Sequence, residues 1–187
     1  MGGPEEPLAF RDGSEWEAWL AANHETQGEA WLLIGKKNSG APLLPIGDAL
    51  DGALCFGWID GQRKGFDATS FLQRYSKRSK RSSWSRVNVG KAEALIASGR
   101  MRPSGLAEIE AARADGRWDA AYESQRTAEV PPDVAEAIAA DPATAVAFEG
   151  LGRTARYALI LPLLKARTPE AREKLLAGVV LKLAGRA

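Results

Sequence analysis

The segment QRYSKRSKRSSWSRVN, residues 73–88, carries the side chains that are best suited to binding an anion. Six basic residues lie between Arg74 and Arg86, serines are interspersed among them, and Trp84 follows a pair of serines. Arginine side chains hold phosphate oxygens through paired hydrogen bonds, hydroxyl groups add donors, and an indole ring can stack on a base. The segment therefore predicts a surface that binds a phosphate group or a nucleic acid.

The predicted ligand contacts in this segment are arginines, serines, one tryptophan and one asparagine. They are Arg74, Arg78, Arg81, Ser83, Trp84, Ser85, Arg86 and Asn88. A structural explanation competes with ligand binding: a solvated loop whose tryptophan fills a gap in the core and whose arginines pair with acidic helices. Asn88 also suits the N-cap of a following helix. The sequence leaves both explanations open.

A second segment, LCFGWIDG at residues 54–61, holds the single cysteine of the chain and ends in an aspartate and a glycine. A catalytic thiol needs a nearby base, and the single histidine, His24, falls in a different predicted helix. Free cysteines are among the most buried residues, so Cys55 is predicted to be structural. Asp60 either closes a turn or orients one of the arginines that follow. Trp58 and Asp60 therefore complete the predicted ligand contacts.

The charge of the chain is unevenly distributed. Residues 61–92 hold nine basic residues and one acid, Asp67, so this region carries a charge of +8. Because the formal net charge of the whole chain is +1, the remaining residues carry −7. Such an asymmetry within one domain indicates an anionic partner for the basic side.

Composition and motifs exclude several classes of protein. The 187 residues are 45% hydrophobic and 26% charged, which is typical of a globular protein. No run of about 20 apolar residues occurs, and the start MGGPEEPLAF lacks the pattern of a secretory signal, so we expect no membrane span and a cytoplasmic location. One cysteine and one histidine predict neither a disulfide nor a metal site. Common catalytic and phosphate-loop motifs do not occur, which favours a non-enzymatic protein without a cofactor.

The N-terminal half alternates between helical and strand patterns. Ser14 and Glu17 match a capping box that opens a first helix, in which Trp16 and Trp19 share the inward side. The later patterns predict a strand and turn over 29–37, a helix over 45–55, and strands over 58–64 and 70–76. These elements predict a small, three-stranded, mostly antiparallel sheet backed by two helices.

The C-terminal half shows helical patterns throughout. Helix starts are indicated at Asn88, Pro103, the VPPD sequence of residues 130–133, and Thr168, and a kink is expected at Pro162. The chain is therefore predicted to be α+β. Residues 1–8 are predicted to be a flexible tail, and 9–187 a single domain with a sheet-containing half at 9–86 and an all-helical half at 87–187.

Several segments occur together in an order that is typical of one family. They are FRDGSEWEAWLAANH, EAWLLIGKKNSG, ALCFGWIDG, SFLQRYSKRSKRSSWSRVN, ALIASGRMRPSGLAEIEAARADGRWDAAY, VPPDVAEAI and KARTPEAREK. Over about residues 10–183 the chain resembles the YdeI/OmpD-associated, or bacteriocin-protection (OmdA-like), family. Lys77 replaces a proline that is usual in the family, and Ala171 replaces a threonine. The resemblance implies an association with stress response or antimicrobial-peptide tolerance and does not imply a reaction.

These observations predict a cytoplasmic, non-enzymatic protein that binds an anionic ligand through residues 74–86. Arginines would hold a phosphate group while Trp84 stacks on the ligand. Two other functions stay open. A protein-protein interaction module would expose an apolar patch on the C-terminal helices beyond Leu175, Leu176 and Val180. An enzyme would centre on Asp60, whose pKa would have to be raised in a cleft.

Overall fold

The computed structural model describes residues 6–185, which fall into two compact units. The first unit holds the described residues up to Trp84 together with Asn88–Ala120. The second holds Ser85–Val87 together with the described residues from Ala121 onward. The strands of the described chain lie in its N-terminal half and the C-terminal half is helical, so the predicted α+β class is confirmed. The single domain over residues 9–187 stays a prediction.

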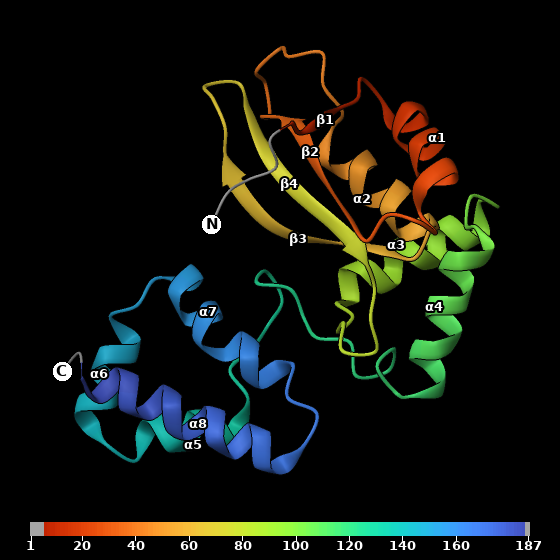
Figure 1. Ribbon diagram of the computed structural model, residues 1–187. Helices are drawn as coiled ribbons and strands as arrows, with labels where there is room; N and C mark the ends of the chain where they lie inside the picture. Colours follow the sequence, from red (N-terminus) through yellow and green to blue (C-terminus); the bar gives the residue numbers. More distant parts are fainter. Residues whose placement is uncertain (1–5, 186–187) are drawn as a thin grey trace. The chain divides into compact units, whose positions relative to one another are not determined.

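The first unit contains a four-stranded sheet in the order β1-β2-β4-β3 (Figure 1). The strands are β1 (Leu8–Ala9), β2 (Glu29–Gly35), β3 (Trp58–Gly65) and β4 (Ser70–Lys77). β4 pairs antiparallel with β2 and β3, as predicted, whereas β1 runs parallel to β2 with Leu8 beside Leu32. β1 was not predicted, because a strand of two residues shows no alternation. It overlaps the predicted tail at residues 1–8, of which residues 1–5 lie outside the described residues.

One face of the sheet packs against α1 (Gly13–Asn23) and α2 (Ile46–Cys55) (Figure 1). Trp16 on α1 is fully buried, and its ring centroid lies 5.8 Å from that of Tyr75 on β4. The indole N–H of Trp16 also donates a hydrogen bond to the carbonyl of Ala49 on α2 at 3.0 Å. The Trp16 side chain thus connects both helices to the sheet. The helical spacing of apolar residues in α1 places this side chain on the face that points into the core.

The start of α1 differs from the predicted capping box. Asp12 is the N-cap, and its carboxylate accepts hydrogen bonds from the backbone N–H groups of Ser14 at 2.9 Å and Glu15 at 3.0 Å. A hydrogen bond from the Ser14 hydroxyl, followed by these backbone bonds, lowers the pKa of Asp12. The predicted pairing of Ser14 with Glu17 was wrong, because a carboxylate two residues earlier already satisfies the free amides of the first turn.

The LCFGWIDG segment forms the corner at which α2 ends and β3 begins. Gly57 stops the helix with a φ of +74°, a conformation that favours glycine. α4 (Pro103–Ala114) packs directly on this corner, since a Cβ atom on Gly105 would lie 2.4 Å from the carbonyl oxygen of Cys55. Cys55 is fully buried, and desolvation raises the pKa of its thiol to about 11. Cys55 is therefore structural, as predicted.

α3 (Arg86–Ala97) begins two residues before its predicted start at Asn88. Asn88 lies inside the first turn of the helix, so its prediction as the N-cap was wrong. Ser85 forms an isolated bridge with Tyr122, and the backbone N–H of Arg86 donates to the carbonyl of Tyr122 at 2.9 Å. This pairing with a residue distant in the sequence sets the start of the helix, and the local sequence carries no sign of it.

The second unit contains α5 (Pro132–Ala139), α6 (Pro142–Glu149), α7 (Arg153–Leu164) and α8 (Pro169–Ala184). Their buried core consists of Val134, Ile138, Phe148, Leu159, Ile160, Leu163, Val179 and Leu183. Arg172 on α8 donates to both carboxylate oxygens of Asp133 on α5 at 2.7 Å and to the carbonyl of Leu163 on α7 at 2.8 Å. This arginine therefore ties three of the helices together. Over residues 6–185, no helix is long and apolar enough to cross a membrane.

Candidate functional site

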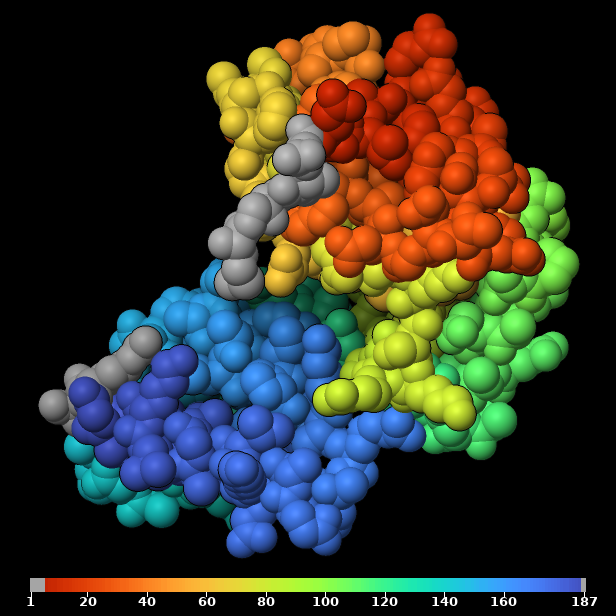
Figure 2. Space-filling model, viewed as in Figure 1, coloured from red at the N-terminus to blue at the C-terminus, as the bar shows by residue number. Residues whose placement is uncertain are grey.

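The middle of the predicted anion-binding segment forms a loop after β4, here called the basic loop, which comprises residues 78–84 and lies on the surface of the first unit (yellow-green in Figure 2). Its first arginine, Arg78, is only 6% exposed. The Arg78 Nη1 donates a hydrogen bond to the carbonyl of Ser83 at 3.3 Å, and its guanidinium carbon lies 3.5 Å from the centroid of the Trp84 ring. Arg78 thus closes the loop on itself.

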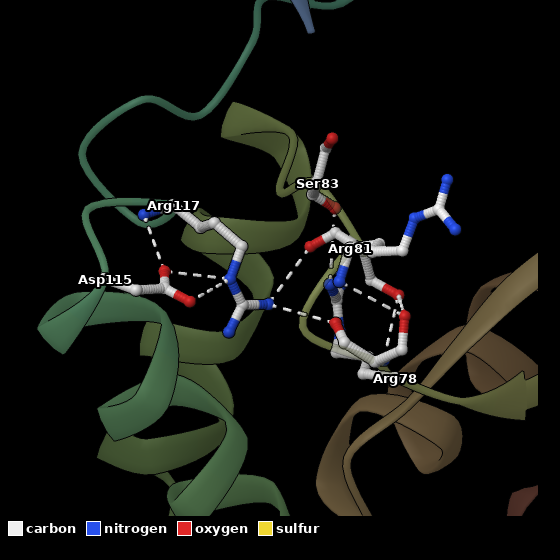
Figure 3. Close-up of polar contacts among 7 residues, drawn as sticks. Arg78, Arg81, Ser83, Asp115 and Arg117 are labelled. Carbon is white, nitrogen blue, oxygen red and sulfur yellow. Dashed lines mark hydrogen bonds and ion pairs between the residues drawn. The ribbon is translucent and has the colours of Figure 1, made fainter. Parts of the chain in front are cut away.

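A second buried arginine, Arg117, holds the basic loop from outside (Figure 3). Its Nε donates to the Asp115 carboxylate at 2.7 and 2.8 Å, and its Nη1 donates to the carbonyls of Ser79 at 3.3 Å and Ser82 at 3.2 Å. Arg117 was not among the predicted site residues. The sequence Asp115-Gly116 indicates a turn, and in the structure Gly116 has a φ of +77°. A turn signal does not show which loop the next residue contacts.

Trp84 does not offer a stacking face to a ligand. The residue is 2% exposed, and its ring packs edge-on against Trp118 at a centroid distance of 4.8 Å while Arg78 covers it. The predicted stacking of Trp84 on a ligand was therefore wrong for this structure, and the competing explanation, a tryptophan that fills the core, describes it correctly. Burying the large apolar indole ring is favourable, so Trp84 packs into the core although the residues around it in the sequence are polar.

The remaining arginines of the predicted surface have separate environments. Arg74 forms an ion pair with Glu29 across β4 and β2. Arg86 has its Nε 3.8 Å from a carboxylate oxygen of Glu123. Arg81 is exposed, and Figure 3 shows its guanidinium pointing away from the loop. The structure therefore gathers Arg78, Ser83 and Trp84 into a self-supporting loop and leaves Arg81 as its outward-facing arginine.

Trp58 and Asp60, the two other predicted contacts, lie on β3. Trp58 is fully buried, with its ring centroid 6.4 Å from that of Trp16. Asp60 is exposed in the strand beside an irregularity in the pairing with β4, so it does not close a turn, and it lines neither of the hollows described below. Burial first, and the Asp60 charge second, raise the pKa of Tyr75 opposite it. An enzyme centred on Asp60 has no support in this geometry.

The first unit does contain a groove between α1 and the start of α4, with a volume of about 830 Å³. It is lined by Ser14, Glu17, Ala18, Ala21, His24, Glu25, Phe56, Arg102, Pro103, Ser104 and Ala107. A hollow of about 230 Å³ shares four of these residues with the groove, namely His24, Glu25, Phe56 and Ser104. The hollow extends the lining to Trp58 and Arg78, so two predicted contacts border this site. An apolar groove with a few convergent polar groups is the usual form of a small-molecule site.

His24 stands at the junction of the groove and the hollow. Its Nδ1 lies 2.9 Å from the carbonyl oxygen of Leu20, and because a carbonyl only accepts, Nδ1 donates this hydrogen bond. Nε2 lies 3.9 Å from a carboxylate oxygen of Glu25. The ring packs against Phe56 at a centroid distance of 5.1 Å. These contacts fix the orientation of the imidazole at the site.

The N-terminus of α4 forms one end of the groove. Arg102 is its N-cap residue but makes no side-chain cap hydrogen bond, and Pro103 occupies the first turn. The first amides of a helix lack intrahelical partners and carry partial positive charge, which favours an anion. The hydroxyl oxygen of Ser104 is buried and has no hydrogen-bond partner among the described residues. A ligand oxygen at this position would satisfy it.

The charges around the groove are mixed: Glu17 and Glu25 line it, Glu108 lines the adjoining hollow, and Arg102 lies at the α4 end. Glu17 is already paired, since its carboxylate oxygen lies 2.6 Å from Arg100. The Glu25 side chain is 85% exposed, so water screens its charge. Arg102, which borders the groove with its guanidinium carbon 5.9 Å from the Phe56 ring centroid, supplies the positive side chain of this end. His24, Arg102 and Ser104 were not predicted as site residues, because the sequence does not show that the end of one helix meets the start of another.

Two family models match the chain. Residues 8–108 match the model described as Domain of unknown function (DUF8412), which covers more than half of the chain. The chain therefore belongs to this family. Residues 127–185 match the model described as Bacteriocin-protection, YdeI or OmpD-Associated, so the resemblance predicted for nearly the whole chain is confirmed over its C-terminal part only. No curated protein and no solved structure matches the chain.

Proposed function

We propose that the protein is a non-enzymatic binder of a small anionic ligand, a carboxylate or a phosphate ester with an apolar body, held in the groove between α1 and α4. The observation that carries this proposal is a combination of three groups at one end of an apolar groove. They are the N-terminus of α4, whose N-cap residue makes no side-chain cap hydrogen bond, the hydroxyl of Ser104, which has no partner within residues 6–185, and the guanidinium of Arg102. Each of these groups donates hydrogen bonds to an anion or attracts its charge.

The apolar body of the ligand is expected along the rest of the groove. Ala18, Ala21 and Ala107 line it, and the ring of Phe56 lies beside His24. Small side chains leave room for a planar or aliphatic group, and burying such a group supplies affinity that a charge in water does not. We therefore expect an amphiphilic anion to bind more tightly than inorganic phosphate.

A small ligand suits this geometry better than a nucleic acid. Recognition of a single strand requires exposed aromatic faces and a row of free cations, whereas Trp84 is buried and Arg74 is paired with Glu29. The anion-binding prediction for residues 74–86 is thus replaced by a site that Lys77 and Arg78 only border, since they line the adjoining hollow. Nucleic-acid binding becomes one outcome of the test.

The expected affinity is moderate. An anion in a partly buried position at a helix end gains up to about 2 kcal/mol, and each hydrogen bond to a charged group contributes about 1.5–3 kcal/mol. The loss of translational and rotational freedom offsets part of this gain. A dissociation constant between about 10 µM and 1 mM is therefore expected.

Isothermal titration calorimetry with phenyl phosphate, benzoate, inorganic phosphate and neutral benzyl alcohol tests the proposal. We expect one of the two aromatic anions to bind saturably, the inorganic ion to bind more weakly, and the alcohol not to bind. The comparison of phenyl phosphate with benzoate identifies the preferred anion. Fluorescent single-stranded and double-stranded oligonucleotides over a salt series form the nucleic-acid arm, and tight, salt-dependent binding there would contradict the proposal.

Arg102→Met is the test variant and Arg113→Met its matched control. Arg113 lies in the last turn of the same helix, about 16 Å along the axis from Arg102. Losing the Arg102 guanidinium should weaken binding of the aromatic anion about tenfold, which corresponds to one hydrogen bond to a charged group. Equal affinities of both variants and the wild type would show that the anion binds elsewhere.

The location and the cellular role belong to the same proposal. We propose a cytoplasmic protein with a role in stress or antimicrobial-peptide tolerance, supported by the match of residues 127–185 to a bacteriocin-protection family. Survival of a deletion strain in the presence of an antimicrobial peptide, complemented with wild type or with Arg102→Met, tests the role. Full complementation by the Arg102→Met variant would separate the cellular role from the groove.

A further inference from the structure

The second unit carries an apolar groove of its own, between α7 and α8, with a volume of about 540 Å³. Ala158 and Pro162 of α7 form one side, and Ala171 and Leu175 of α8 form the other. Leu175 is 36% exposed and lines the groove next to Val179. The groove follows α8 from Ala171 to Lys182, which is about 16 Å, or three helical turns.

Gly178 lies in the middle of this groove, and the described chain offers no reason for a glycine there. Glycine destabilises the interior of a helix relative to alanine. A Cβ atom on Gly178 would meet nothing within 4 Å, and the glycine is not among those with a positive φ. An open position without a side chain leaves room for another backbone to approach the helix closely from outside.

Two lysines mark the ends of the open stretch. Lys174 and Lys182 lie about 12 Å apart along α8, and both line the groove. Within residues 6–185, neither lysine forms an ion pair. An occupant of the groove therefore meets an apolar floor flanked by two ammonium groups that have no ion pair among the described residues, and carboxylates spaced about two helical turns apart complement them.

A second copy of this chain is a poor occupant. If two α8 helices paired antiparallel about a twofold axis at Gly178, Lys174 of one copy would face Lys182 of the other, because Gly178 is the midpoint between them. The symmetry of such a pair repeats the same contact twice. Like charges would thus be opposed at both ends of the interface, which disfavours this pairing.

We infer that the groove between α7 and α8 is a docking site for an acidic amphipathic helix of another protein. The helix lays its apolar side chains over Leu175 and Gly178, and its carboxylates pair with Lys174 and Lys182. A groove of three turns with small residues in its floor suits recognition through apolar anchors at i, i+3 or i+4, and i+7. This interaction is independent of the anion site of the first unit.

The test uses the full chain and two designed helical peptides of about 14 residues that share the same leucine anchors. One peptide carries glutamates at the two flanking positions and the other carries lysines. Fluorescence anisotropy should show saturable binding of the acidic peptide and binding of the basic peptide that is at least about tenfold weaker. Equal binding of the two peptides, or binding of neither, would overturn the inference.

Two variants locate the binding. Gly178→Leu should abolish binding of the acidic peptide, because the new side chain fills the open position. The double variant Lys174→Glu/Lys182→Glu should reverse the preference and bind the basic peptide, which also shows that the variant is folded. Arg126→Glu is the matched control, since Arg126 is exposed in the second unit and does not line the groove.

Sedimentation velocity of the peptide-free protein completes the test. A single species whose sedimentation does not change with concentration is expected for the wild type. A concentration-dependent dimer that disappears in Gly178→Leu would assign the groove to a second copy and overturn the inference. Retention of the acidic preference by the double charge variant would overturn it as well.

Discussion

Replacing Arg117 with methionine should loosen the basic loop and destabilise the first unit. Methionine keeps an apolar stem but removes the guanidinium that donates to the carbonyls of Ser79 and Ser82 at 3.3 and 3.2 Å. Both bonds are long, so each is assigned the lower end of the range for hydrogen bonds to charged groups, about 1.5 kcal/mol. The loss of both predicts a decrease of about 3 kcal/mol in the free energy of unfolding.

The other partner of Arg117 adds little to this figure. The side chain of Asp115 is 36% exposed, whereas that of Arg117 is 3% exposed. Water can therefore hydrate the Asp115 carboxylate once the guanidinium is gone. The carbonyls of Ser79 and Ser82 lose their hydrogen-bond donor, and this loss accounts for the expected decrease in the free energy of unfolding.

Urea denaturation followed by tryptophan fluorescence measures the change in stability, and trypsin cleavage after Lys80 measures the opening of the loop. Arg81→Met is the matched control, because Arg81 is exposed and points away from the loop (Figure 3). Its effect should stay within about 0.5 kcal/mol. If Arg117→Met were as stable as Arg81→Met and equally resistant to trypsin, the role assigned to Arg117 would be refuted.

Three further predictions follow from single residues. Gly178→Ala should raise the free energy of unfolding by about 1 kcal/mol, because alanine favours a helix interior and the position is open; a destabilised variant in urea denaturation would contradict this. Asp133→Asn should lower stability at neutral pH, because hydrogen bonds from Arg172 hold the pKa of the Asp133 carboxyl below its usual value. That contribution is complete above the unfolded pKa of about 3.9 and is lost as the pH falls through the folded pKa, so denaturation over a pH series should show the difference shrinking in acid rather than growing. The Cys55 thiol, whose pKa burial raises to about 11, should react with a disulfide reagent near pH 8 only on unfolding, and rapid reaction of the native protein would show that it is accessible.

The parts of the fold that periodicity controls were predictable from the sequence. The alternation in β4 and the helical spacing of apolar residues in α2 indicated these elements, and both occur where they were expected. β1 escaped prediction because it depends on pairing with β2 rather than on its own two residues. The start of α3 could not be predicted for a similar reason, because it depends on the bridge between Ser85 and Tyr122, which are distant in the sequence.

The candidate site was less predictable, because basic residues serve two purposes that composition does not separate. Arg78 and Arg117 donate hydrogen bonds to carbonyls of the chain itself, whereas Arg102 borders a groove. In the sequence, Arg78 stands in a conspicuous basic run and Arg102 does not. What distinguishes them is the packing of α4 on the corner at Gly57, where a Cβ atom would lie 2.9 Å from the carbonyl oxygen of Ser104. That contact joins segments far apart in the chain.

The most direct test of the anion site is a titration of isotopically labelled protein with phenyl phosphate, followed by the NMR shifts of its backbone amides. Binding at the N-terminus of α4 predicts saturable shifts that are largest at Ser104 and Gly105 and that are absent in the Arg102→Met variant at the same ligand concentration. Shifts confined to the basic loop around Arg81, or no saturable shifts at all, would contradict the proposed groove between α1 and α4.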